Sequence, residues 1–89
     1  MINKIEFDPT VDAGYIYLAN GKVLESEEIA PGIVLDYDDK NNIIGIEILD
    51  LHKQTNSTIE KLPLTIQQHV HTLIANVLEQ EVVRNQNYF

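Results

Sequence analysis

The chain has 89 residues, no cysteine and a formal net charge of −8. Its length predicts a single domain (1–89), and the lack of cysteine excludes a disulfide framework and a thiolate zinc site. No apolar segment approaches the roughly 20 residues that cross a bilayer, so we expect a cytoplasmic protein without membrane contacts. The charge imbalance lies entirely in residues 1–51, with eleven acids against three lysines, and this field disfavours direct nucleic-acid binding.

Residues 2–50 predict short β-strands separated by turn residues. Asn20-Gly21 predicts a two-residue hairpin between the second and third strands, because a type I′ turn needs positive φ at both of its central positions. Pro31-Gly32 predicts a type II turn into the fourth strand, since glycine supplies the positive φ which that turn requires.

Residues 36–47 place their acids at intervals similar to those of a calcium-binding loop. However, Lys40 and Asn41 occupy the positions where such a loop needs an oxygen ligand and a glycine. The flanking segments are β-branched runs, whereas the calcium motif lies between two helices. We therefore predict that residues 38–42 form a polar hairpin turn and bind no metal.

A helical pattern follows a polar connector. Thr65 with Gln68 matches a capping box, and the amphipathic helix is expected over about 65–82. Its apolar stripe consists of Ile66, Val70, Leu73, Ile74, Val77 and Leu78. The predicted segments are a β-sheet module (1–51), a connector (52–62), a C-terminal helix (63–84) and a frayed tail (85–89).

A sheet face and a helix stripe each need an apolar cover, so we predict a two-layer α+β fold. The sheet is expected to be an antiparallel meander of about five strands (2–50), with the helix packed on one face. The covered face would carry Ile5, Phe7, Ile16, Leu18, Ile44, Ile46 and Ile48. The opposite face would carry Glu6, Asp8, Tyr15, Tyr17 and Glu47, and Asp36 as well if Val34 points outward.

Three blocks in order, FDPTVDAGYIYL, SEEIAPGIVLDYD and IIGIEILD, resemble the small bacterial family domain of unknown function 2283 over about residues 5–51. The resemblance implies a compact β-rich module without established catalytic activity. It also implies an interaction or antitoxin role, because such genes tend to lie near small toxin-like ones. Gly14 departs from the family, which usually has a bulky apolar residue there, and a strand glycine admits a close neighbour. The matched positions are Asp8, Pro9, Asp12, Ala13, Tyr15, Leu18, Glu28, Pro31, Gly32, Asp36, Asp38, Gly45 and Glu47.

Four residues form the candidate interaction face: Tyr15, Tyr17, Asp36 and Glu47. Asp36 and Glu47 are predicted to pair across adjacent strands, where carboxylates share a proton or a cation. The two tyrosines point the same way, which suits a protein interface amid acids. The alternative interpretation is that these are solvated acids and ordinary cross-strand packing.

The three histidines do not predict a metal site. On a helix, His69 and His71 point about 200° apart, so they cannot bind one ion together. His52 lies in the connector without a fixed relation to either of them.

The absence of a catalytic constellation favours a non-catalytic interaction module that binds a basic protein partner, without catalytic residues, metal or cofactor. A second hypothesis is a small metal-dependent hydrolase that uses Asp36 and Glu47 with Asp8 or Asp12. A third is a purely structural homo-oligomer, for which a dimer is expected.

Overall fold

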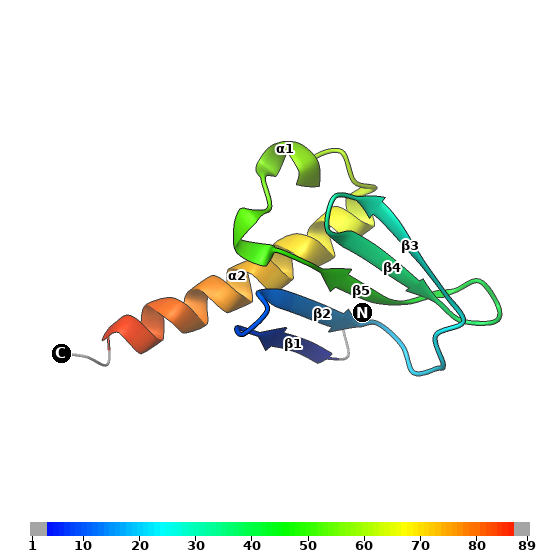
Figure 1. Cartoon of the computed structure of the whole chain (residues 1–89), viewed down its shortest axis with the longest axis horizontal. Coiled ribbons are helices and arrows are strands. Elements are labelled where there is room, and N and C mark those ends of the chain that lie inside the picture. Colours follow the sequence, from blue (N-terminus) through cyan, green and yellow to red (C-terminus); the bar gives the residue numbers. More distant parts are fainter. Residues whose placement is uncertain (1–3, 87–89) are drawn as a thin grey trace.

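The computed structural model describes the backbone of residues 4–86 and the side chains of residues 4–82 (Figure 1). It contains one five-stranded sheet and a long C-terminal helix, so the predicted α+β class is confirmed. The elements in chain order are β1 (Lys4–Asp8), β2 (Ala13–Tyr17), β3 (Glu25–Ala30), β4 (Ile33–Tyr37), β5 (Ile43–Ile48), the 3-10 helix η1 (Leu51–Lys53), α1 (Asn56–Ile59) and α2 (Leu64–Gln86).

The strands lie in the order β1-β2-β5-β4-β3, and all neighbours are antiparallel. The sheet therefore consists of a β1-β2 hairpin and a β3-β4-β5 meander, which meet where β2 pairs with β5. The prediction of an antiparallel sheet is confirmed, but the order differs from that of one continuous meander.

The predicted hairpin at Asn20-Gly21 is wrong, because β2 and β3 do not pair. Residues 18–24 instead lead the chain away from β2 to β3 at the far edge (Figure 1). The Leu18 amide donates to the Ile44 carbonyl (3.0 Å), which continues the contact between β2 and β5. The physical reason is burial. The acidic strand β3 is exposed along its first four residues and suits an edge, whereas β5 is largely buried and apolar.

One hydrophobic core lies between the sheet and the helical segments, and Figure 1 shows α2 crossing one face of the sheet. Ile5, Phe7 and Leu18 are partly buried against this core, and Ile44 is 4% exposed. The covered face is therefore as predicted. The side chains that are fully buried are Ile16, Ile33, Ile46, Ile48, Val70 and Leu73.

The opposite face, which we call the open face, carries the acids and tyrosines. Leu35 pairs with Ile46 and points into the core, so Val34 points outward and Asp36 shares the open face with it. No helix within residues 4–86 packs against this face, since the buried helical residues all join the core on the other side. The open face includes Lys4, Glu6, Asp8, Ala13, Tyr15, Tyr17, Ser26, Glu28, Val34, Asp36, Gly45 and Glu47.

The helix α2 packs closely against the sheet at Gly14. A Cβ atom at this position would lie 2.6 Å from Leu73 Cδ2 and 3.2 Å from Leu51 Cδ1. The expectation that glycine here admits a close neighbour is thus confirmed, and the neighbour is the helix itself.

The helix α2 has 23 residues, and Val77 is its last buried side chain among those described, which end at Val82. Leu78, predicted in the stripe, is 44% exposed. The helix begins one residue before the predicted cap Thr65, and it continues through the first two residues of the predicted tail; residues 87–89 lie outside the described part of the chain. Its C-terminal end extends beyond the sheet (Figure 1). None of the helices in residues 4–86 is long and apolar enough to cross a membrane.

We predict that Gly14→Val lowers the free energy of unfolding by about 1–3 kcal/mol, because the new side chain must displace Leu73 from a closely packed contact. Ala13→Val is the matched control, since it adds a β-branched side chain at the neighbouring position of the same strand, and we expect a change within about 0.5 kcal/mol. Urea denaturation of both variants measures the difference. Equal losses would show that α2 does not depend on the small residue at position 14.

Candidate functional site on the open face

The four residues predicted as an interaction face lie together on the open face. Tyr15 in β2 is the register partner of Glu47 in β5, and its hydroxyl group donates to Asp36 in β4. The rings of Tyr15 and Tyr17 meet edge to face, with their centroids 4.6 Å apart. The structure thus brings the four side chains into one cluster.

The predicted direct pairing of Asp36 with Glu47 is wrong. Asp36 lies opposite Gly45, and Glu47 lies opposite Val34. The two acids are therefore diagonal neighbours, for which Cα atoms lie about 7–8 Å apart. Tyr15, and not the second acid, provides the close contact to Asp36.

The phenol ring of Tyr15 crosses over β5 at Gly45 to reach Asp36. A Cβ atom at position 45 would overlap the Tyr15 hydroxyl oxygen, so only glycine leaves room for this crossing. Tyr15 Oη and Ser26 Oγ each donate to the Asp36 carboxylate at 2.5 Å. These hydrogen bonds connect β2, β4 and β3 across the open face, and we call them the Tyr15–Asp36–Ser26 bridge.

Asp36 is 7% exposed and is the one charged side chain that is buried among the described residues. Burying a carboxylate is costly unless hydrogen bonds satisfy it, and the two hydroxyl donors do so. Burial and the hydrogen bond to Asp36 raise the pKa of Tyr15, so this phenol remains a donor throughout the neutral range. The bridge therefore fixes the position of the Asp36 carboxyl group within the sheet.

A groove of about 390 Å³ lies beside the bridge on the open face. The acids Glu6, Asp8 and Glu47 line it together with both tyrosines, and Ala13 leaves space because its side chain is small. Ligand sites commonly have volumes of about 300–1,000 Å³. The hydrogen bond with Tyr17, followed by the contacts with Lys4, lowers the pKa of Glu6, which keeps this wall of the groove anionic.

The acids of the proposed hydrolase do not gather at one point. Asp8 accepts hydrogen bonds from the Thr10 amide (2.9 Å) and hydroxyl (2.6 Å), and Asp12 binds His52. Among the described residues, no group of three histidines or acids is arranged to hold a metal ion. The geometry thus gives this hypothesis no ligand set.

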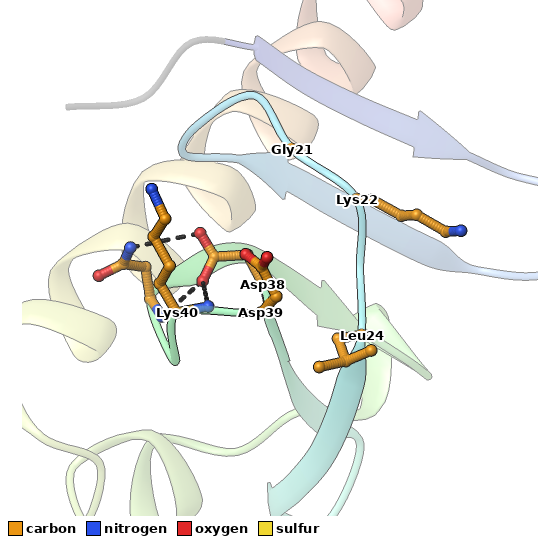
Figure 2. A pocket seen from close by; sticks show the side chains of 7 residues that line it. Gly21, Lys22, Leu24, Asp38, Asp39 and Lys40 are labelled. Carbon is orange, nitrogen blue, oxygen red and sulfur yellow. Dashed lines mark hydrogen bonds between the residues drawn. The ribbon is translucent and has the colours of Figure 1, made fainter.

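Residues 38–42 form the turn between β4 and β5, as predicted. The Asp38 carboxylate accepts hydrogen bonds from the backbone N–H groups of Lys40 and Asn42, both at 2.9 Å. The hydrogen bond from Asn42 is the main cause that lowers the pKa of Asp38. A pocket of about 460 Å³ lies between this turn and residues 18–24, but Figure 2 shows the Lys22 side chain pointing away from Asp38. The Asp38 carboxylate therefore stabilises the backbone of its own turn.

His52 links two segments that are distant in the sequence, and no sequence pattern predicts this link. Its Nδ1 lies 2.6 Å from Asp12 Oδ1, and its Nε2 lies 2.7 Å from Glu81 Oε1 in α2. Only a doubly protonated imidazole ring can donate hydrogen bonds to both carboxylates. The contact with Asp12, and after it the contact with Glu81, raises the pKa of His52. His69 and His71 take no part in this link, which fastens the β1-β2 turn to the helix.

The family described as Protein of unknown function (DUF2283) matches residues 4–51, which is more than half of the chain. The chain belongs to this family. No protein of curated function and no solved structure was found to be similar. The DUF2283 segment contains all five strands, and hence the whole Tyr15–Asp36–Ser26 bridge, whereas α2 lies outside it.

We predict that Tyr15→Phe lowers the free energy of unfolding by about 1–3 kcal/mol, because it leaves buried Asp36 with one hydroxyl donor fewer. Tyr17→Phe is the matched control in this DUF2283 chain, since that ring is 38% exposed and the variant should lose less than about 0.5 kcal/mol. Chemical denaturation at neutral pH checks both. The bridge would be unimportant if the two variants lost the same amount.

We also predict that His52 stabilises the fold more in weakly acidic than in alkaline solution. Its pKa is raised in the folded state, so its contribution is complete below the unfolded value of about 6.5 and is lost as the pH rises through the folded value. The difference in melting temperature between wild type and His52→Gln should therefore be larger at about pH 5.5 than at about pH 8.5.

His71→Gln is the control for this pH dependence, because His71 is exposed on α2. Its melting temperature should follow that of the wild type across the range. A gap for His52→Gln that stays constant or grows toward alkaline pH contradicts the assignment.

Proposed function

We propose that this chain is a non-catalytic module that binds a basic protein partner through its open face. The observation that supports this most strongly is the placement of one acid on each of the two strands that flank Tyr15. Glu6 and Glu47 are both register partners of Tyr15, one on each neighbouring strand. Complementary charge steers a basic partner to such a surface, and tyrosine supplies contact area at low entropic cost.

The state of each carboxylate also favours binding over catalysis. Asp36 is already held by two hydroxyl groups, so it is poorly placed to act as a base or a nucleophile. Glu47 takes no part in the ion pairs among the described side chains, which leaves its charge available to a partner. An antitoxin role, which the family resemblance implies, is one form of this function and would make the partner a small basic toxin.

A homodimer remains a separate prediction. Leu78 and Val82, which follow Val77 on α2 and are 44% and 55% exposed, offer apolar surface away from the open face. Self-association there would leave the open face free for the basic partner.

The proposal is tested by capture from cells of the source organism at low salt, followed by affinity measurements with the purified captured protein. We expect a basic protein whose affinity falls about tenfold for the double variant Glu6→Gln, Glu47→Gln and also falls with added salt.

The double variant Glu60→Gln, Glu79→Gln is the matched control, because it removes the same charge from exposed positions just after α1 and within α2. It should retain the wild-type affinity. Equal losses for both double variants, or a captured protein whose binding does not depend on Glu6 and Glu47, would overturn the proposal.

A further inference from the structure

A cation from the chain itself contacts two residues that line the groove on the open face. Lys4 Nζ lies 3.2 Å from Glu6 Oε1 and 5.5 Å from the centre of the Tyr17 ring. An ammonium group within about 6 Å of an aromatic centroid makes a cation–π contact. The Lys4 side chain is 64% exposed, so it lies on the surface and can leave these contacts without disturbing the core.

We infer that the groove between Glu6, Tyr15, Tyr17 and Glu47 is the site for an arginine side chain of the basic partner, and that Lys4 competes with that arginine. This inference rests on the proposed function and names the chemistry of its central contact. In the free protein Lys4 neutralises part of the groove. In the complex the partner's arginine replaces it.

Charge favours a cationic occupant. The groove is lined by three acids, Glu6, Asp8 and Glu47, and Lys4 forms an ion pair with the first of them. One ammonium group therefore leaves the groove with a negative charge to be balanced. A second cation would find an acid on the other strand that flanks Tyr15, at Glu47.

Geometry favours arginine over lysine. Glu6 and Glu47 lie on strands that flank β2, so their Cα atoms are separated by two strand spacings, or about 10 Å. A guanidinium group presents five donors in a plane and stacks on aromatic rings, so it can lie against a tyrosine while donating toward carboxylates on both sides. The ammonium group of lysine is a compact point charge, so it can contact Glu6 or Glu47 but not both at once.

The probe for this inference is a blocked peptide, Gly-Ser-Arg-Gly-Arg-Ser-Gly, together with versions in which lysine or citrulline replaces each arginine. Titrations followed by nuclear magnetic resonance give the affinity of each peptide for wild type and variants. We expect the arginine peptide to bind more tightly than the lysine peptide. The citrulline peptide, which keeps the shape and loses the charge, should not bind.

Removing the competitor should strengthen binding. For Lys4→Gln we expect the affinity for the arginine peptide to rise about 2- to 5-fold, the range that corresponds to one exposed cation–π contact. Lys61→Gln makes the same change in net charge at an exposed position between α1 and α2, and it should alter the affinity by less than about 1.5-fold. Lys4→Arg keeps a competing cation and should show no gain.

The inference fails if Lys4→Gln and Lys61→Gln strengthen binding equally, since net charge alone would then explain the gain. It also fails if the arginine peptide binds neither wild type nor Lys4→Gln. Loss of the captured partner in Glu6→Gln, Glu47→Gln without any gain in Lys4→Gln would reject the arginine site and leave the proposed function standing.

Discussion

The arrangement of the open face depends on the hydroxyl group of Tyr15, whose side chain passes over Gly45. Tyr15 reaches over Gly45 to donate to Asp36, which is buried on the side of the sheet that faces solvent. Without this donor and Ser26, the desolvated carboxylate would lack compensation and its burial would oppose folding. The bridge also determines the chemistry of the face, because it engages one acid internally and leaves Glu6 and Glu47 beside the groove.

Much of this arrangement could be predicted from local pattern. The alternation of apolar and polar residues in the strands predicted which side chains lie on each face of the sheet. The helical spacing of apolar residues predicted the buried stripe of α2. The order of the strands could not be predicted in this way. Asn20-Gly21 is a strong local signal for a hairpin, but the acidic strand β3 gains more from an edge position than from a place beside β2. Burial across the whole sheet decided the topology.

Two contacts were not predicted from the sequence, the bridge at Asp36 and the link made by His52, and both join residues that are distant in the chain. The signal for the bridge was present in Gly45, since a glycine inside an apolar strand indicates a close approach, here by a tyrosine. The contact between His52 and Asp12 spans 40 residues and left no pattern in the sequence. It fastens α2, which lies outside the DUF2283 segment, to the sheet near Gly14. The DUF2283 sheet of this chain is thus covered by a helix that packs closely against Gly14.

We propose that the partner binds to the open face, and not to α2 or to the β3 edge. Amide chemical-shift mapping of the ¹⁵N-labelled chain, titrated with the basic partner, tests this most directly. The account predicts that the perturbed amides lie in β1, β2 and β5, around Tyr15 and Glu47. Perturbations confined to α2 or to β3 would contradict it.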